Sequence, residues 1–423
     1  MIIKPKIISG GEDVGSGSLL IRFHYLAIEN GELVNKIAER YCNVGDTVTP
    51  PTISTSLDAV TKQSCALTFK EWNYTNVQLT NIQTDIDVGA IYNTSDSKTH
   101  AFVTVNAGTG YNLPVYFNKS DSSTLTISWG DGTTDYTTTD SGDITTTHTY
   151  STAGIYEITI WISSGNGTFI FGYNGGSLTC FIGGTNQAYR NCLNSIFMDG
   201  NIRNSNLSGA FNSAKNLKFV TLSTYITNLY TNSFRACYNL QYISLPTSVL
   251  TIEGSNFRES NLTFISIPLS VTTIYNFNFQ ECDSLEKIII PSSVTNFYNQ
   301  ECYNCYSLKQ VVVNANITTL SSSIFGYCRY LTEVELSNTV QDLNNGVFDN
   351  LSGTKVIFTL KRFTAPSTIT TLSNTNVFNT INNQTRIYVP VGSETVYKTA
   401  TNWSTYANYI YEDNPTNRAL FGD

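Results

Sequence analysis

The sequence predicts a mainly β, multi-domain protein that ends in a repeat solenoid, and two observations carry this prediction. Short runs of alternating apolar and polar residues fill much of the first 165 residues. A unit of 22 or 23 residues then recurs from Phe211 onward, with a phenylalanine, a leucine six residues later and a short apolar strand. One such unit cannot bury its apolar face without neighbours, so the units stack into a solenoid.

The N-terminal region is predicted to hold a flexible or docking arm at residues 1–18 and a small β-rich domain at residues 19–92. The arm is glycine-rich, and terminal segments of this kind are seldom ordered by themselves. The segments VGDTVTPP, LTFKEWNY and TDIDVGAIY resemble the β-grasp repeats of bacterial surface proteins. The matching residues are Gly45, Asp46, Pro50, Phe69, Trp72, Asp85, Ala90 and Tyr92.

Residues 98–165 alternate as the strands of a small β-sandwich do. The runs ISWGDGTTD and HTYSTAGIYEITI resemble the polycystic-kidney-disease (PKD) domain, an immunoglobulin-like sandwich. The matching residues are Trp129, Gly130, Asp131, Gly132, His148, Tyr150, Gly154 and Tyr156. The resemblance implies a spacer or weak binding unit without chemistry. Linkers are predicted on both sides, NTSDSKT at 93–99 and SGNGTFIFGYNGG after the sandwich.

The solenoid is predicted at residues 178–360, with a cap at 361–411 and a tail at 412–423. Its F-x-x-C-x-x-L-x-x-I-x-I-P units resemble the BspA-like leucine-rich repeats of bacterial surface proteins. The segment RIYVPVGSETVYKTATNWSTYANYI resembles the end of such arrays, through Val389, Pro390, Tyr397, Trp403 and Tyr406. A strand and an amphipathic helix there are expected to cover the last open repeat.

Composition and charge narrow the possible partners. Only 13% of the residues are charged and the net charge is −8, so no basic surface for nucleic acid is expected. The sequence contains no run of 18 apolar residues, so no membrane-spanning segment is predicted. The start, MIIKPKIISGG, lacks the apolar stretch of a secretory signal. We expect an extracellular or virion protein, or alternatively a bacterial cell-surface protein whose signal was removed.

Most of the nine cysteines have a structural interpretation. One repeat position is occupied by Cys192, Cys237, Cys282, Cys305 and Cys328. Free cysteine behaves as a small apolar residue in such a ladder, and the Cys302-x-x-Cys305 spacing follows from the repeat rather than from a zinc site. The roles of Cys42, Cys65 and Cys180 stay open, and an odd total leaves at least one free thiol.

The sequence predicts no catalytic residue, no metal site and no cofactor. The three histidines are His24, His100 and His148, and no nucleophile-elbow motif accompanies them. The carboxylate pairs Asp85/Asp87 and Asp131/Asp135 could ligate Ca²⁺, but no complete ligand loop surrounds them, so solvated turns are favoured.

The best candidate binding residues lie on the predicted solenoid strands. Positions between the inward apolar residues are expected to face solvent. They form two columns, Phe219, Tyr242, Phe264, Lys287, Gln310 and Glu333 beside Thr221, Ser244, Ser266, Ile289, Val312 and Glu335. The three aromatics and three hydroxyls are candidate ligand-binding residues for sugar rings or apolar side chains. Two alternatives stay open: cross-strand contacts that only stabilise the sheet, and coverage by the preceding sandwich.

These features predict a non-enzymatic adhesion or recognition protein. The favoured setting is a virion appendage, a phage tail or head fibre, whose solenoid binds a host-surface glycan or protein. Other structural proteins of the particle or cell surface are expected partners, together with a possible homo-oligomer. The alternative is a bacterial cell-surface or secreted adhesin. A glycan-processing enzyme is a third hypothesis, which needs a carboxylate pair on one face.

Overall fold

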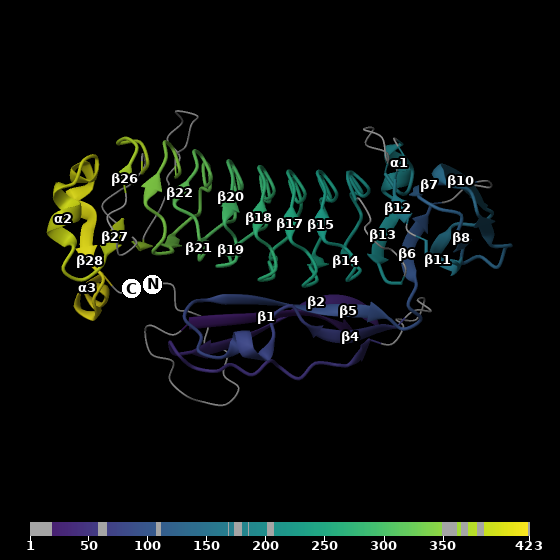
Figure 1. The fold of residues 1–423 in the computed structure, drawn as a ribbon, viewed down its shortest axis with the longest axis horizontal. Coiled ribbons are helices and arrows are strands. Elements are labelled where there is room, and N and C mark those ends of the chain that lie inside the picture. The colour runs from purple at the N-terminus through teal and green to yellow at the C-terminus, as the bar shows by residue number, and fades with distance from the viewer. Residues whose placement is uncertain are drawn as a thin grey trace.

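The computed structural model describes most of the chain. The described residues are 19–57, 66–106, 111–167, 169–172, 180–184, 186–200, 207–348, 362–364, 371–378 and 385–421. The predicted arm at residues 1–18 and Cys65 lie outside them. The described elements are mainly strands, as predicted, and they form three regions in chain order (Figure 1).

The N-terminal region is one five-stranded sheet in the order β2-β1-β5-β4-β3. Its elements are β1 (Leu19–Glu29), β2 (Glu32–Cys42), β3 (Ser56–Leu57), β4 (Leu67–Trp72), the short helix η1 (Asn76–Leu79) and β5 (Ile86–Thr94). Strands β1 and β2 form a long antiparallel hairpin. Asn30 and Gly31 close it with positive φ values of 53° and 78°, the conformation that two-residue hairpin loops require. The resemblance to β-grasp repeats stays a prediction.

The second region consists of two sheets around a shared apolar core. Its strands are β6 (Thr99–Val105), β7 (Tyr111–Lys119), β8 (Thr124–Ser128), β9 (Tyr136–Thr138), β10 (Gly142–Tyr150), β11 (Gly154–Ser164) and β12 (Phe169–Phe171). Tyr150 donates a hydrogen bond to the Trp129 carbonyl at 3.0 Å, and His148 stacks on the Trp129 ring. Strand β12 lies within the segment expected to be a linker. The resemblance to PKD domains stays a prediction.

The solenoid continues directly from this region, because its first strand pairs antiparallel with β6. One strand face is formed by β13 (Leu193–Phe197), β14 (Phe219–Thr221), β16 (Tyr242–Ser244), β19 (Lys287–Ile290), β21 (Gln310–Val313), β23 (Glu333–Leu336), β25 (Arg362–Thr364), β27 (Arg386–Val389) and β28 (Ile410–Glu412). The other strands are β15 (Asn228–Leu229), β17 (Thr251–Ile252), β18 (Thr273–Ile274), β20 (Asn296–Phe297), β22 (Thr319–Leu320), β24 (Asp342–Leu343) and β26 (Thr371–Leu372). The predicted solenoid is confirmed.

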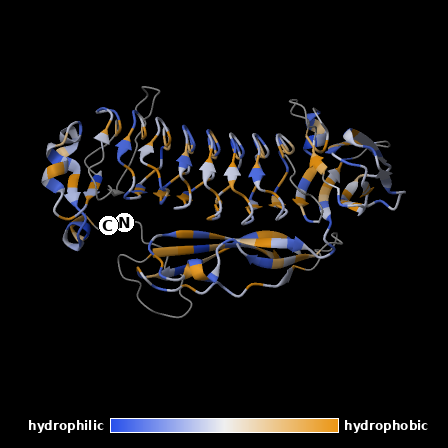
Figure 2. Cartoon of the chain, in the orientation of Figure 1, coloured by the Kyte–Doolittle hydropathy of each residue, from blue (hydrophilic) through white to orange (hydrophobic). Residues whose placement is uncertain are grey.

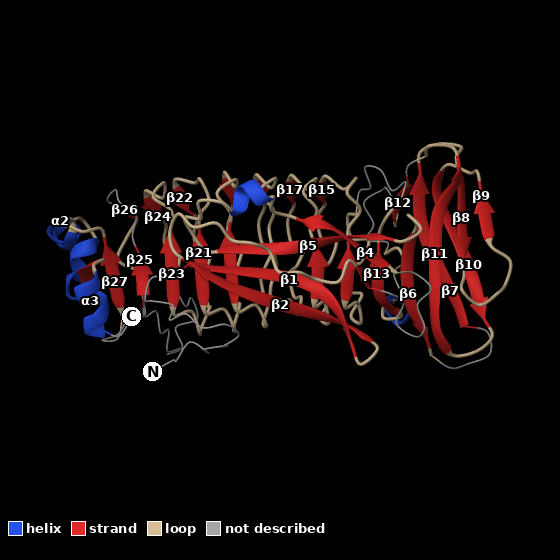
Figure 3. Cartoon of the chain, turned by 90° about the horizontal axis from the view of Figure 1, so that it is seen from below, coloured by secondary structure: helices blue, strands red, loops and turns tan. Residues whose placement is uncertain are grey.

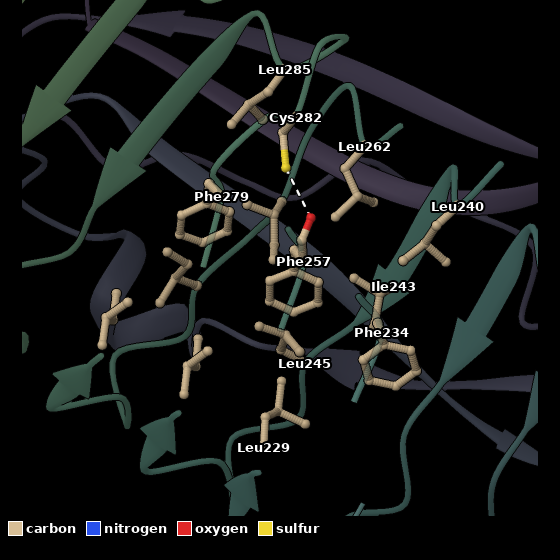
Figure 4. Close-up of a cluster of buried hydrophobic side chains, with 14 of the residues drawn as sticks. Leu229, Phe234, Leu240, Ile243, Leu245, Phe257, Leu262, Phe279, Cys282 and Leu285 are labelled. Atoms are coloured by element: carbon tan, nitrogen blue, oxygen red, sulfur yellow. Dashed lines mark hydrogen bonds between the residues drawn. The ribbon is translucent and has the colours of Figure 1, made fainter. Parts of the chain in front are cut away.

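The repeat residues form ladders inside the solenoid (Figure 4). The rings of Phe234, Phe257 and Phe279 stack nearly parallel, with centroids 6.2 and 5.7 Å apart. The Cys282 thiol donates to the Phe257 carbonyl of the preceding repeat at 3.0 Å. The Cys305 thiol makes the same bond to Phe279 at 2.8 Å. The cysteine position is therefore small and buried, as the repeat predicted, and its thiol also donates a hydrogen bond, which the repeat did not predict.

The two ends of the solenoid are covered by different structures. Helix α1 (Gln187–Arg190) lies beside the second region at the first end (Figure 1). At the other end are α2 (Glu394–Thr399), the 3₁₀ helix η2 (Trp403–Tyr409) and α3 (Pro415–Phe421). Trp403 and Tyr397 are fully buried there and meet edge to face. Strand β27 and helix α2 form the strand and helix expected of the cap.

The N-terminal sheet lies along the solenoid, and its long strands cross the solenoid strands β14 to β21 (Figures 1 and 3). Figure 2 shows hydrophobic residues on the strands of this sheet and along the side of the solenoid that faces it. One apolar cluster joins the two bodies, with Leu26 and Tyr92 from the sheet packed with Phe219 and Tyr242 from the solenoid. The chain therefore folds back over its own repeats.

Candidate functional site

The structure places all six candidate binding residues under the N-terminal sheet. The exposed fractions are 7% for Phe219, 3% for Tyr242 and 6% for Phe264. The hydroxyl residues beside them, Thr221, Ser244 and Ser266, are equally buried. The expectation that these six residues face solvent is wrong, because β1 and β5 pack over them. The alternative of a cover by the sandwich is corrected too, since the cover over these six residues is the N-terminal sheet. A ligand-binding role for them stays a prediction.

Hydrogen bonds hold the sheet on this covered face, which we define as Phe219–Thr221, Tyr242–Ser244 and Phe264–Ser266. Both Tyr242 Oη and Ser244 Oγ donate to the Ala90 carbonyl, at 2.7 and 2.8 Å. Ser266 Oγ donates to the Asp87 carbonyl at 2.7 Å. Ser244 and Ser266 therefore bond to backbone carbonyls of β5, which satisfies hydroxyls that would otherwise be buried without partners, whereas the Thr221 hydroxyl is buried and has no partner among the described residues.

Two ion pairs flank these hydrogen bonds. Lys287 Nζ lies 2.7 Å from an Asp85 oxygen, and both side chains are mostly buried. Arg22 binds Asp87 through two parallel contacts of 2.7 and 2.8 Å, and its guanidinium lies over the Phe264 ring. The interpretation of Asp85 and Asp87 as solvated turn residues is wrong. Asp85 forms an ion pair across the interface with Lys287, and Asp87 forms one beside the interface with Arg22.

A glycine permits the close approach of the two bodies. A Cβ atom at Gly89 would lie 3.1 Å from Ser266 Cβ and 3.2 Å from Asn73 Nδ2. Asn73 Nδ2 also donates to Ser266 Oγ at 2.9 Å. The absence of a side chain at Gly89 lets β5 lie directly against the solenoid backbone.

His24 lies in the same interface and has no exposed surface. Its ring stacks parallel to Phe264, and neither ring nitrogen has a hydrogen-bond partner among the described residues. Burial, and then the nearby Arg22, hold the pKa of His24 well below its usual value. A neutral imidazole therefore belongs to the docked arrangement.

The other two histidines have structural partners. His100 contacts Asp96 and Glu157, each at 2.8 Å. His148 contacts Asp131 at 2.7 Å, so this carboxylate belongs to the sandwich framework. Within the described ranges, no group of three or more His, Cys, Asp or Glu side chains is arranged to hold a metal ion.

An open groove lies on one flank of the solenoid. Its lining comes from consecutive repeats and comprises Tyr238, Glu259, Ser260, Asn261, Glu281, Asp283, Asn304 and Tyr306, around a volume of about 410 Å³. One repeat position, the residue after the cysteine position, contributes Tyr238, Asn261, Asp283 and Tyr306 in order. Two short side chains between two tyrosines leave the hollow. We call this the flank groove.

Arginines balance two of the groove carboxylates. Glu259 contacts Arg235 at 3.2 Å and Arg258 at 3.3 Å, and it accepts a hydrogen bond from the Tyr238 hydroxyl at 3.0 Å. Glu281 contacts Arg258 at 3.4 Å. Positive φ angles of 61° and 60° present Glu259 and Glu281 from the turns. The turn conformation and the ion pairs with arginine therefore both hold the Glu259 and Glu281 side chains in place.

Asp283 differs from the other two carboxylates. Burial raises its pKa, followed by the nearby Cys305 and Glu281, although the Tyr306 backbone donates a hydrogen bond to it. Sequence reasoning did not identify the flank groove, because it considered only strand positions. The signal was present in the same repeat alignment, because one turn position holds two tyrosines three repeats apart with Asn261 and Asp283 between them.

The comparisons with known proteins decide the family. Six copies of the BspA type leucine rich repeat region match the chain over residues 185–276, 251–383 and 299–414. Together these ranges run from 185 to 414, more than half of the 423 residues. The chain belongs to the BspA-type leucine-rich repeat family. The resemblance of the repeats to this family is thereby confirmed.

Solved structures similar to this BspA-type chain share little identity with it. A Treponema pallidum (T. pallidum) leucine-rich repeat protein is 22% identical over 36% of this chain and 72% of that chain, with a TM-score of 0.33. A Eubacterium ventriosum leucine-rich repeat protein is 19% identical over 50% and 67%, with a TM-score of 0.34. A Faecalibacterium prausnitzii leucine rich cell surface protein is 19% identical over 52% and 72%, with a TM-score of 0.27. No curated protein matches this chain.

The BspA-type chain shows no helix, among its described residues, that is long and apolar enough to cross a membrane.

Proposed function

We propose that this BspA-type protein is a non-enzymatic recognition protein that binds a surface glycan or protein through the solenoid flank. One observation carries the proposal: the N-terminal sheet covers the strand face and leaves the flank groove open, with aromatic and polar side chains around it. Mixed aromatic and polar linings of this kind are typical of ligand sites. The sheet and solenoid share hydrogen bonds, ion pairs and an apolar cluster, so they act as one body.

A glycan-processing enzyme is the competing hypothesis, because the groove does bring carboxylates together. Retaining and inverting glycosidases need one carboxyl as proton donor and one as nucleophile or base. Glu259 and Glu281 instead contact arginines, and Asp283 lies at an exposed position. The raised pKa of Asp283 suits a proton donor, but Glu259 and Glu281 are paired with arginines and are better placed to hold a ligand than to act as the nucleophile or base.

The setting is proposed to be extracellular. Only 13% of the residues of the chain are charged, and the chain is rich in Thr, Ser, Asn and Tyr. Two locations fit this composition, a phage particle and a bacterial cell surface. Other structural proteins of the same particle or envelope, and further copies of the chain, are proposed as partners.

Binding of the labelled full chain to intact bacterial cells tests the function. The proposal expects saturable binding and no release of reducing sugar from purified surface polysaccharide. Turnover that is lost in Asp283→Ala would support the enzyme instead. Absence of binding to every cell type and surface polysaccharide tested would contradict recognition.

Antibody detection in fractions distinguishes the two locations. A particle protein is expected in purified virions, and a surface protein in the envelope or culture supernatant of uninfected cells.

A further inference from the structure

The flank groove contains chemistry that selects a class of ligand. Its carboxylates and amides lie between two tyrosines that come from the same position of repeats three units apart. Neighbouring parallel strands are about 4.8 Å apart, so the two tyrosines are separated by roughly 14 Å along the solenoid. The short side chains of Asn261 and Asp283 form the floor between them.

Each tyrosine already makes a cation–π contact with a basic side chain from the repeat outside the groove. Lys215 Nζ lies 5.4 Å from the centre of the Tyr238 ring, and the Arg329 guanidinium lies 4.8 Å from that of Tyr306. Together with Arg235 and Arg258, these residues place positive charge around the groove carboxylates. The groove therefore does not need a cationic ligand to balance its charge.

The floor nevertheless demands hydrogen-bond donors. A carboxylate only accepts hydrogen bonds, and an amide side chain both accepts and donates. No ion pair to Asp283 occurs within the described part of the chain. A ligand with many hydroxyl groups supplies donors to Asp283 and acceptors to the Asn261 amide nitrogen, since the Asn261 oxygen already accepts a hydrogen bond from the Ser284 hydroxyl. Phosphate and sulfate groups supply acceptors only and would face carboxylates.

We infer that the flank groove binds a short segment of a neutral glycan, with sugar rings against Tyr238 and Tyr306 and hydroxyl groups on Asn261 and Asp283. This inference rests on the proposed recognition function and names the ligand class for it. The volume of about 410 Å³ is within the ~300–1,000 Å³ range of small-ligand sites. Because the groove is open at the surface, it fits an internal or terminal stretch of a polysaccharide.

Immobilised oligosaccharides test the inference with the full chain. The neutral probes are cellobiose, lactose, mannobiose and chitobiose, and the acidic probes are sialyllactose and a glucuronate-containing disaccharide. A trilysine peptide serves as the cationic competitor. The inference expects binding to at least one neutral probe, weaker binding to acidic probes and no displacement by trilysine.

Variants place the binding in the groove. Tyr238→Ala and Asp283→Ala are each expected to weaken the neutral-glycan affinity by about 10-fold or more. Both positions are exposed, so an unchanged unfolding midpoint is expected. Tyr275→Ala is the matched control, since Tyr275 is 43% exposed against 44% for Tyr238 and lies outside the groove lining. Its affinity should stay within about 2-fold of the wild-type value.

Four results would overturn the inference: no neutral probe bound, acidic probes preferred, displacement by trilysine, or equal losses in the control variant. Cell binding measured in parallel separates this failure from that of the proposed function. If both groove variants still bind cells as the wild type does, the recognition function is retained and the groove is not its site. Binding to neither cells nor glycans removes both.

Discussion

At the residue scale, buried ionisable groups define where this protein is sensitive to pH. Glu301 occupies the position before Cys302 and has no exposed surface. One carboxylate oxygen accepts the Asn278 amide hydrogen at 3.0 Å, and the other has no partner among the described residues. Burial raises the pKa of Glu301 well above its usual value, which the Asn278 hydrogen bonds only partly offset. The sequence did not predict this site, because repeat alignment shows no reason for a carboxyl there.

We expect Glu301→Gln to remove a pH-dependent loss of stability. Since the folded pKa is raised, the contribution of this group is fully present below the unfolded value of about 4.3 and is lost as pH rises. The variant should therefore be more stable than the wild type at pH 8, by about 1–2 kcal/mol, and nearly equal at pH 4.5. Urea unfolding at the two pH values measures this. A larger gain at the lower pH would contradict the assignment.

We expect His24→Phe to remove a pH dependence of the opposite sign. The folded pKa of His24 is lowered, so its contribution is present above the unfolded value of about 6.5 and is lost as pH falls below it. Protonation would place a second cation beside Arg22 and Phe264. Protease cleavage of the N-terminal domain should accelerate from pH 7 to pH 5 in the wild type and much less in the variant. Equal acceleration in both would show that another group controls docking.

At the element scale, the solenoid was predictable and its cover was not. Spacing alone revealed the repeats, because every unit must present the same inward residues to its neighbours. The cysteine ladder followed from the same alignment and is confirmed in Cys282 and Cys305. Strand alternation identified the outward columns, but it cannot tell solvent from another domain. The alternating residues Val88 and Ala90 of β5 gave no indication that the sheet would meet Phe264 or Tyr242.

We expect the two ladder positions to respond differently to truncation. Phe257→Ala should cost about 3–5 kcal/mol, because Phe257 is fully buried between two stacked rings and leaves a cavity. Cys282→Ser should cost less than about 2 kcal/mol, since a hydroxyl can keep the hydrogen bond to the Phe257 carbonyl, and Ser260 occupies the same position in the preceding repeat. Chemical denaturation followed by circular dichroism measures both. Similar losses would contradict the ladder model.

At the scale of the whole molecule, β5 and the two residues before it run along the solenoid and contact one repeat after another. Thr94 contacts Asp199, Ala90 contacts Tyr242 and Ser244, Asp87 contacts Ser266, Asp85 contacts Lys287, and Thr84 contacts Asn314. Such a series depends on residues more than a hundred positions apart in sequence. Reasoning from a single sequence cannot find contacts between residues so far apart, so it wrongly expected these strand residues to face solvent.

We expect Gly89→Leu to release the N-terminal sheet. Gly89 has no positive φ, so its strand tolerates a side chain, whereas the 3.1 Å approach to Ser266 does not. The individual domains should stay folded while their contact is lost. Hydroxyl-radical footprinting detects this through the oxidation rate of Tyr242, which should rise in the variant while that of Tyr238 stays the same.

The central claim is that the sheet covers the strand face and leaves the flank open, and the native chain tests it most directly. Tyr238 and Tyr242 are the same residue type four positions apart, with exposed fractions of 44% and 3%. Footprinting of the unmodified protein should oxidise Tyr238 readily and leave Tyr242 protected. Equal oxidation of the two tyrosines would contradict the covered face and return the strand columns to the list of open surfaces.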